Sequence, residues 1–302
     1  MKTFPTQYTM ASAAGQMSFH LPERVPYEGN PILVGTEEQE FAGQNATYIS
    51  VIPTTGVLEN PIDAFYAYVA THDSSEIWLA TAPHPLGPWT WQRVVVALGE
   101  TSYRAHVSSP SAVVHEGEVY LYFHGVHPQG TQPTSLATSK DGVHFEQRIF
   151  ELMGTHPNRQ NHWYGQSVSY VRVVKDGPMF IGTFQGNALG QNDQANGVTT
   201  VSGLAMSEDG IHWRLSKRPL MGNKPGSRGP FASTLVRLWG RWLMLFNEDG
   251  GLSGAVSEGS DVTGPYEHIG CVIESAHWPF PVFHEDKLYL LCAGINAYVI
   301  EW

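Results

Sequence analysis

The sequence contains little cysteine and no long apolar run. Its two cysteines, Cys271 and Cys292, are too few for a disulfide framework. We expect both to be small buried apolar residues in a reducing compartment, although a single bridge between them stays open. No apolar run approaches the ~20 residues that a membrane span requires, and the first 21 residues have no continuous apolar core. The sequence therefore predicts a cytoplasmic protein that has no membrane partner.

Positive charge is also scarce. The 302 residues include 17 basic and 28 acidic side chains, for a net charge of −11, and Lys and Arg form no cluster. Proteins that bind nucleic acid neutralise phosphates with such clusters, so nucleic acid is not an expected partner. Charged residues make up 15% and apolar residues 42% of the chain, a balance that excludes a disordered protein or a coiled coil.

Turn-forming and sheet-forming residues are abundant instead. The chain has 31 Gly and 20 Pro together with 9 Trp, 13 Tyr and 13 Phe. Aromatic residues favour strands, and Gly and Pro favour the turns between them. This composition predicts an all-β fold.

A strand–turn–strand pattern recurs five times along the chain. Aligned on the turn, the equivalent positions are Asp63, Gly117, Gly177, Gly240 and Asp286, which lie 46 to 63 residues apart. That spacing suits one four-stranded blade for each copy. We therefore predict that residues 1–302 form a single domain, a five-bladed β-propeller. The five copies read ATYISVIPTTGVLENPIDAFYAYVATH, SPSAVVHEGEVYLYFHG, QSVSYVRVVKDGPMFIGTF, FASTLVRLWGRWLMLFNED and WPFPVFHEDKLYLLCAG.

The fifth copy lacks a fourth strand, because only AYVIEW follows it before Trp302. A closed ring leaves no open sheet edge. We expect a segment within residues 1–20 to pair with this blade and close the propeller. A second repeated feature is the turn in SKDGVHF and SEDGIHW, where His144 and His212 occupy matching positions on outer hairpins. We interpret these two histidines as architectural.

In a propeller, the loops that enter the inner strands and those that leave the second strands meet at one mouth of the central channel. Here these loops mix aromatic rings with amides, hydroxyls and a few charges, which suits the apolar faces and hydroxyls of a sugar. The competing interpretation is that the same side chains only pack between blades. The predicted substrate-binding residues are Gln44, Asn45, Tyr103, Arg104, Ser109, His162, Trp163, Gln166, Phe231, Asp249 and Trp278.

The segments PSAVVHEGEVYLYFHG and GPFASTLVRLWGRWLMLFN, with NPIL at 30–33, resemble the five-bladed propeller glycosidases. These are the arabinanases and xylosidases of glycoside hydrolase family 43 and their relatives, including fructosidases and mannoside phosphorylases. The resemblance covers residues 28–302 and implies the propeller fold and a carbohydrate substrate. It also implies a catalytic set of acidic residues, in which one carboxyl donates a proton while another stays ionised.

The sequence departs from that catalytic set at each expected place. It has Asn45 in the first blade, Ser109 and Ser111 in the second, and Arg228 before Gly-Pro where the family has Glu-Gly-Pro. Glu248, Asp249 and Asp73 at the ends of second strands are the best substitutes, and Glu274 is a weaker one. We therefore predict a non-standard catalytic set.

Histidine and arginine offer a different chemistry at the same mouth. An imidazole exchanges a proton near neutral pH, and an Arg stabilises an anion. The prediction is a carbohydrate-active enzyme that acts on a small glycoside or oligosaccharide. The alternatives are a lyase that uses His, Tyr and Arg, and a sugar-binding protein without turnover. No cofactor is predicted, and a divalent metal held by histidines in the channel stays open. The predicted catalytic residues are His106, His277, Arg228, Glu248 and Tyr164.

Overall fold

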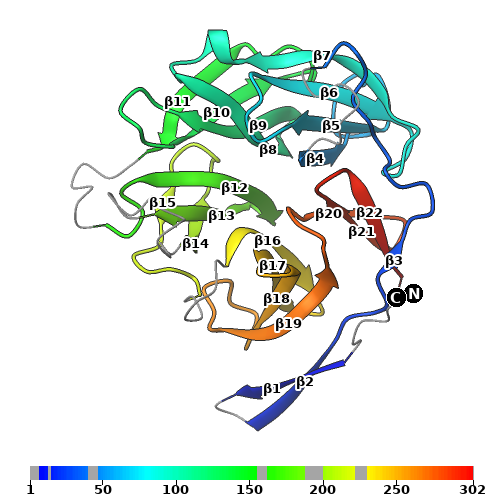
Figure 1. Cartoon of the computed structure of the whole chain (residues 1–302), viewed down its shortest axis with the longest axis vertical. Coiled ribbons are helices and arrows are strands. Elements are labelled where there is room, and N and C mark those ends of the chain that lie inside the picture. The colour runs from blue at the N-terminus through cyan, green and yellow to red at the C-terminus, as the bar shows by residue number, and fades with distance from the viewer. Residues whose placement is uncertain are drawn as a thin grey trace.

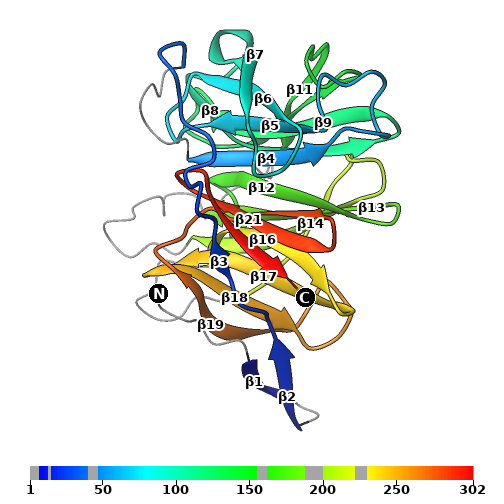
Figure 2. The ribbon, with the colours of Figure 1, turned by 90° about the vertical axis from the view of Figure 1, so that its right-hand side faces the viewer.

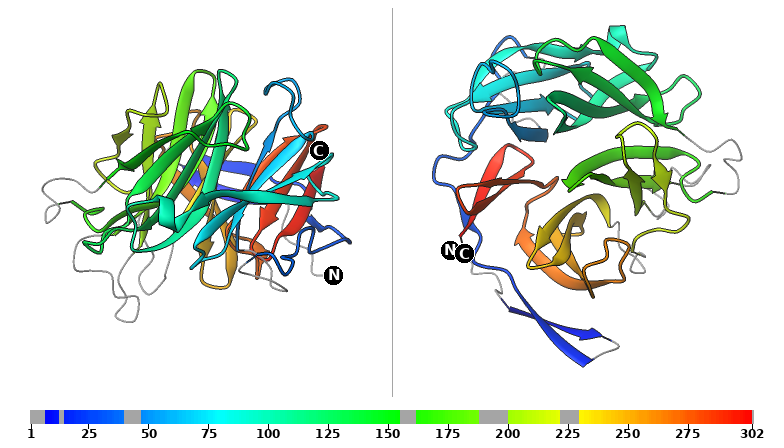
Figure 3. Two further views of the ribbon diagram at one scale, coloured as in Figure 1. Left: turned by 90° about the horizontal axis from the view of Figure 1, so that it is seen from above. Right: turned by 180° about the vertical axis from the view of Figure 1, so that it is seen from behind.

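The computed structural model describes residues 7–12, 15–39, 47–154, 162–187, 200–221 and 230–301. Five four-stranded antiparallel sheets surround a common centre, and a two-stranded hairpin projects from the ring (Figure 1). Figures 2 and 3 show the same five sheets from the side, from above and from behind. The predicted all-β, five-bladed propeller is confirmed.

Each blade follows the order of the sequence from the centre outward, except that the outer strand of blade V comes from the N-terminal region. Blade I consists of β4 (Tyr48–Pro53), β5 (Phe65–Ala70), β6 (Glu76–Ala82) and β7 (Thr90–Ala97). Blade II consists of β8 (Ala105–His115), β9 (Glu118–Val126), β10 (Thr134–Ser139) and β11 (Gln147–Met153), after the short 3-10 helix Leu98–Glu100. Blade III consists of β12 (Ser167–Asp176), β13 (Met179–Asn187), β14 (Val201–Ser207) and β15 (Arg214–Leu215).

Blade IV consists of β16 (Phe231–Leu238), β17 (Arg241–Glu248), β18 (Gly251–Ser257) and β19 (Tyr266–Glu274). Blade V consists of β20 (Phe280–His284), β21 (Lys287–Cys292), β22 (Asn296–Glu301) and β3 (Val25–Pro26). The second strand of a blade is covered on both faces by the neighbouring blades, so β5 reads FYAYVA with every residue buried. The outer strand β7 is exposed or half-buried along most of its length. This difference explains why the inner halves of the blades carry the repeated apolar pattern.

An N-terminal segment completes the last blade, as expected, but it lies just after the predicted residues 1–20. Strand β3 pairs with β22 through Val25 opposite Val299 and Pro26 opposite Tyr298. Residues 7–20 instead form the hairpin of β1 (Gln7–Ser12) and β2 (Gly15–His20). A hairpin satisfies its own pairing, so the sheet edge of blade V is left for the following segment.

The link between the hairpin and β3 fills the seam between blades IV and V. Phe19 and Leu21 are buried in the apolar cluster that both blades share. The buried guanidinium of Arg24 donates to the carbonyls of Val272 and Leu21. The N-terminal region therefore closes the ring by packing as well as by strand pairing.

The repeated Asp-Gly turns tie each blade to the one before it. The Tyr68 hydroxyl of blade I donates to the Gly142 carbonyl of blade II at 2.8 Å, and the Tyr122 hydroxyl of blade II donates to Gly210 of blade III at 2.9 Å. Gly142 has φ +71°, and a Cβ there would lie 2.9 Å from the Tyr68 hydroxyl, so only glycine fits.

Three inner strands carry a bulge at matching positions. The pairing register shifts between Ser108 and Ser111 in β8, between Ser169 and Arg172 in β12, and between Phe231 and Thr234 in β16. Inside these shifts Ser109, Tyr170 and Ala232 have φ of 51°, 50° and 49°. A bulge redirects a side chain out of the regular alternation, and such bulges are frequent beside active sites. Here the bulges change the direction of side chains that lie near the centre of the ring.

The structure changes one expectation about cysteine. Both cysteines are free thiols; Cys292 is buried, as expected, but Cys271 is exposed on β19. No helix in the described part of the chain is long and apolar enough to cross a bilayer.

Candidate functional site

The channel mouth is lined by aromatic side chains from several blades. Tyr48 of β4 and Tyr170 of β12 pack against Trp278, which lies in the loop that enters blade V. The Tyr170 and Trp278 rings stack with centroids 5.2 Å apart at 23°, and Tyr48 meets Trp278 edge-on at 4.8 Å. Phe231, at the start of β16, meets the same indole at 5.6 Å. We call Tyr48, Tyr170, Phe231 and Trp278 the aromatic wall.

A chain of polar contacts leads from solvent to this wall. Asp73 and His72 follow β5, and the His72 Nδ1 lies 3.2 Å from the Asp73 Oδ1. A carboxylate only accepts hydrogen bonds, so Nδ1 carries the proton and the Nε2 of His72 accepts from the Tyr170 hydroxyl, 2.9 Å away. The side chain of Asp73 is 88% exposed and that of His72 is 55% exposed. These contacts connect the Tyr170 hydroxyl to two solvent-exposed side chains.

Two further imidazoles lie beside the same residues. The His106 Nδ1 lies 3.8 Å from the Asp73 Oδ1, and its side chain is 9% exposed. His124 lies behind it, fully buried, with the two ring centroids 5.5 Å apart. The backbone N–H of Tyr170 donates to the Nδ1 of His124 at 3.4 Å, which fixes the hydrogen of that ring on Nε2. We call Asp73, His72, His106, His124 and Tyr170 the channel cluster.

Burial decides which groups of the channel cluster carry a proton at neutral pH. Burial, and then the neighbouring His72, lower the pKa of His106, so its ring is neutral. Burial also lowers the pKa of His124 well below its usual range. In contrast, burial raises the pKa of Tyr170 to about 12, so the phenol keeps its proton. The cluster thus places a neutral base, His106, near a protonated acid, Tyr170.

Several buried polar atoms at the centre of the ring have no hydrogen-bond partner within the described ranges. They include the Nε2 atoms of His106 and His124, whereas the hydroxyls of Tyr48, Tyr170 and Ser109 lie close enough to interact with one another. Most buried polar atoms in native proteins are hydrogen-bonded, so a convergent group of unpaired ones indicates a place for water or a ligand. The equivalent hydroxyl of Ser111 has a structural partner, because it accepts the Val173 N–H of blade III.

Arg172 adds a buried positive charge below Tyr170. Its side chain donates to the Pro110 carbonyl and lies over the Phe280 ring, with the guanidinium carbon 5.5 Å from the ring centroid. It forms no ion pair with any residue that the structure describes. Burial lowers the pKa of Arg172 to about 10, so the group stays charged at neutral pH. A buried cation without a carboxylate partner favours an anionic ligand group nearby.

The structure places the predicted site residues in several different parts of the molecule. His106, Ser109, Phe231 and Trp278 meet at the channel mouth, as the blade pattern implied. Glu248 does not join them: its Oε2 accepts from Ser253 at 2.9 Å and lies 2.8 Å from the Nε2 of His268. The remaining predicted residues lie elsewhere on the mouth face, in the core between blades, or outside the described residues, as set out next.

Tyr103 is a core residue between blades I and II, and its hydroxyl hydrogen-bonds Pro133 and Ser135. Tyr164 and Trp163 pack together with Phe184, and burial raises the pKa of Tyr164. Gln166 donates to the Gly130 carbonyl and so links two blades. Arg104 and Asp249 are exposed, and His162 and His277 are half-buried. Gln44, Asn45 and Arg228 lie outside the described residues.

Sequence reasoning missed five residues of the site: Tyr48, His72, His124, Tyr170 and Arg172. His72 and His124 lie at or just after the ends of second strands, where the sequence has no repeated pattern that marks them. Tyr170 and Arg172 lie within an inner strand that reads SVSYVRVVKD and looks like a plain core strand. Only the bulge of β12 turns them towards the centre, and no sequence signal marks that bulge.

A metal-binding arrangement occurs away from the channel. In the described part of the chain, one group of three side chains brings its ligand atoms within 4.8 Å of one another: His84, His284 and Glu285. The three channel histidines do not form such a group. His84 lies in the turn after β6, His284 is the last residue of β20, and Glu285 lies in the turn that follows β20. Both turns are at the end of the blade opposite the channel mouth.

Comparison with known proteins shows a shared fold. The sequence matches no protein-family model and none of the curated proteins. Among solved structures, the family 43 β-xylosidase/α-arabinofuranosidase CoXyl43 from a compost metagenome, in complex with xylotriose, has a TM-score of 0.65 at 13% identity, covering 92% of this chain and 94% of that one. The GH43_1 enzyme from Xanthomonas citri has a TM-score of 0.63 at 14% identity, covering 91% and 89%.

A family 117 glycoside hydrolase from the marine bacterium Zobellia galactanivorans is similar as well. Its TM-score is 0.60 at 14% identity, over 85% of this chain and 84% of that one. The predicted resemblance to five-bladed propeller glycosidases is therefore confirmed for the architecture of the chain.

Proposed function

We propose that this chain is a carbohydrate-active enzyme that cleaves a glycosidic bond in a small glycoside or oligosaccharide at the channel mouth. Histidine and tyrosine would supply the proton transfers in place of the usual carboxylate pair. The observation that carries the proposal is the Asp73–His72–Tyr170 chain, which lies beside His106 and the aromatic wall. The propeller glycosidases of similar fold support the carbohydrate as substrate class.

In hydrolysis, His106 is the general base. Its neutral ring removes a proton from a water molecule, whose oxygen attacks the anomeric carbon. Tyr170 is the general acid, because it keeps its proton at neutral pH and gives it to the departing glycosidic oxygen. The Tyr170 phenolate then regains a proton from water through His72, whose Nε2 first takes up that proton, and the His106 imidazolium releases its own proton to water. Trp278 and Phe231 provide flat apolar faces for the C–H side of a sugar ring.

A second candidate reaction is β-elimination on a uronate, and Arg172 favours it. In that reaction His106 removes the proton on the carbon next to the carboxylate, and Tyr170 protonates the leaving oxygen as the C–O bond breaks. The buried charge of Arg172 would stabilise the carboxylate and the enolate that forms from it. Arg228, predicted for this role from the sequence, lies outside the described residues and stays a candidate.

The two reactions and mere binding differ in their products. The purified protein is incubated with neutral oligosaccharides, aryl glycosides and uronate-containing oligosaccharides. Hydrolysis yields a new reducing end without ultraviolet absorbance, whereas elimination yields an unsaturated product that absorbs in the ultraviolet. A protein that only binds sugar gives neither, but shows saturable binding by calorimetry. Turnover that survives in a His106→Ala, Tyr170→Phe double variant would contradict the proposed site.

A further inference from the structure

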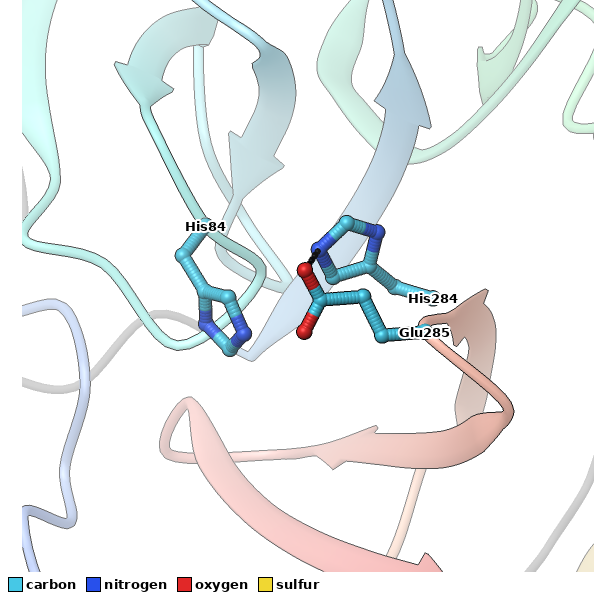
Figure 4. Close-up of side chains that lie close together, drawn as sticks. All are labelled: His84, His284 and Glu285. Atoms are coloured by element: carbon cyan, nitrogen blue, oxygen red, sulfur yellow. Dashed lines mark ion pairs between the residues drawn. The ribbon is translucent and has the colours of Figure 1, made fainter.

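The seam between blades I and V contains a three-residue cluster that the proposed reaction does not use. His84 comes from blade I, and His284 and Glu285 come from blade V (Figure 4). The two imidazole centroids lie 5.2 Å apart, and the carboxylate of Glu285 points between the rings. Two imidazoles and one carboxylate are a common ligand set for Zn²⁺, with water in the fourth position.

The separations of the three ligand atoms fit coordination of a shared ion better than direct hydrogen bonds between the side chains. The His284 Nε2 lies 3.6 Å from the Glu285 Oε1, which is longer than a hydrogen bond. Ligand atoms about 2.0–2.2 Å from a tetrahedral zinc lie about 3.3–3.6 Å from one another. Since all three ligand atoms are within 4.8 Å of one another, small side-chain rotations bring them to that separation. The cluster is therefore close to the geometry of a bound ion.

The ring of His84 is held in a suitable direction. The backbone N–H of Leu86 donates to its Nδ1 at 3.1 Å, which leaves Nε2 as the atom that faces the other two side chains (Figure 4). Coordination through Nε2 moves the ring hydrogen to Nδ1 and costs two contacts, the one from the Leu86 N–H and the one between Nε2 and the Tyr289 hydroxyl at 3.5 Å. The Tyr289 ring packs edge-on against His84 with centroids 5.5 Å apart and limits its rotation.

The surroundings favour a cation. His84 and Glu285 lie at the edge of a groove of about 730 Å³ that solvent enters. Glu23, Glu28 and Glu301 also line this groove, against a single ammonium, that of Lys287. Lys287 itself is paired with Glu301 at 2.8 Å. This excess of carboxylates over ammonium groups favours a divalent cation, and access from the groove would leave such an ion room for a water ligand.

Blade II contains a natural comparison for this cluster. Its first hairpin turn reads His115-Glu116, the same dipeptide at the same position as His284-Glu285 in blade V. There, however, the facing group is a cation, because the Lys175 ammonium lies 2.8 Å from the His115 Nδ1. An ammonium in that place excludes a metal ion, whereas His84 in the blade V seam supplies a third ligand.

We propose that His84, His284 and Glu285 bind one Zn²⁺ ion, which ties blade V to blade I on the face opposite the channel mouth. The ion would join the first and last blades of the ring beside β3, the strand that completes blade V. The site is independent of the proposed glycosidic reaction.

The test is a zinc titration of the chelator-treated full chain, followed by calorimetry and by thermal unfolding. We expect one ion per chain and a rise of several degrees in Tm on zinc addition. His84→Ala and His284→Ala should lose both effects, and Glu285→Gln should weaken binding about tenfold or more. Glu285 has a side chain that is 72% exposed, so its substitution leaves the fold intact.

Two control variants test where in the molecule the ion binds. His115→Ala removes the matched histidine of blade II, and His106→Ala removes a channel histidine; both should bind zinc like the original chain. The proposal is overturned if no saturable binding occurs, or if the stoichiometric site survives in His284→Ala. Loss of the site in His106→Ala alone would assign the ion to the channel and would equally overturn it.

Discussion

The chain contains aspartate–histidine pairs in two settings that differ in how completely their atoms are bonded. On the outer hairpins, the Nδ1 of His144 lies 2.7 Å from Asp141, and His212 repeats this contact with Asp209 at 2.7 Å. The other oxygen of each aspartate accepts two backbone N–H groups and a serine hydroxyl. These pairs are fully bonded and occur twice at matching positions.

At the channel mouth the aspartate–histidine pairs do not recur between blades, and some of their atoms lack a hydrogen-bond partner. Asp73 lies 3.2 Å from His72 and 3.8 Å from His106, and the Nε2 of His106 has no partner in the part of the chain that the structure describes. Polar groups whose hydrogen bonds are all made stabilise a fold. Buried polar groups that lack a hydrogen-bond partner occur more often where a ligand binds. The comparison therefore predicts that the outer elements determine stability and the channel mouth determines turnover.

The largest expected effect concerns the closure of the ring. Deleting residues 1–26 removes β3 together with the buried side chains of Phe19 and Leu21, each worth about 3 kcal/mol. We expect the free energy of unfolding to fall by more than about 5 kcal/mol, as measured by denaturant unfolding. Deleting residues 1–14 removes only the first strand of the projecting hairpin, and should have a much smaller effect. Equal stability of the two truncations would contradict the assignment of closure to residues 19–26.

His106→Ala tests the channel side of the comparison. Loss of a general base should lower kcat/KM by roughly 10²–10⁴-fold on the substrate identified by the product assay, with little change in Tm. His144→Ala is the matched control, because it removes a histidine of an outer pair. That variant should keep its activity and lose some stability. The comparison between the two settings fails if both substitutions affect turnover equally.

Tyr170→Phe distinguishes the role of Tyr170 as a general acid from its role in the aromatic wall. The variant keeps the ring that stacks on Trp278 but loses the hydroxyl that donates to His72. We expect a fall in kcat of about 10²-fold with KM nearly unchanged, since the sugar-stacking surface remains. The measurement is steady-state kinetics at several pH values. A change in KM alone would assign Tyr170 to binding instead of proton transfer.

The fold was predictable from the sequence because each blade repeats the same two buried strands. The turn positions from Asp63 to Asp286 identified all five first hairpins, and the missing fourth strand of blade V pointed to closure by an N-terminal segment. The position of that segment was predicted too early. Residues 7–20 form their own hairpin, and the two-residue strand at Val25 and Pro26 is too short to produce a periodic pattern.

The candidate site was predictable in part. Residues at the mouth end of a blade, such as His106 near the start of β8 and Trp278 in the loop before β20, follow from blade topology alone. Tyr170 and Arg172 do not, because a one-residue bulge decides whether an inner-strand side chain faces a neighbouring blade or the channel. Glu248 had the right position in the repeat, but its carboxylate is held by Ser253 of β18 and His268 of β19 within its own blade, and sequence position alone does not show these side-chain contacts.

The smallest expected effect is the pH dependence of the stability that the aspartates of the two outer hairpins contribute. Burial alone would raise the pKa of Asp141 and Asp209, but hydrogen bonds from the histidine, the backbone and the serine outweigh it and hold both pKa values well below their usual range. A carboxyl whose pKa is lower in the folded state stabilises the fold above its unfolded pKa of about 3.9, and this contribution is lost as the pH falls through the folded value. The two side chains are about half exposed, so each contributes only about 1 kcal/mol.

The double variant Asp141→Asn, Asp209→Asn should therefore be less stable than the original chain at pH 6–7, with Tm lower by about 2–4 °C. The difference should shrink as the pH falls below about 4, because protonation then removes the same charges from the original chain. Thermal unfolding across that pH range measures it, and turnover at pH 7 should stay unchanged. A stability difference that persists below the folded pKa would show that the turns depend on the geometry of the side chain and not on its charge.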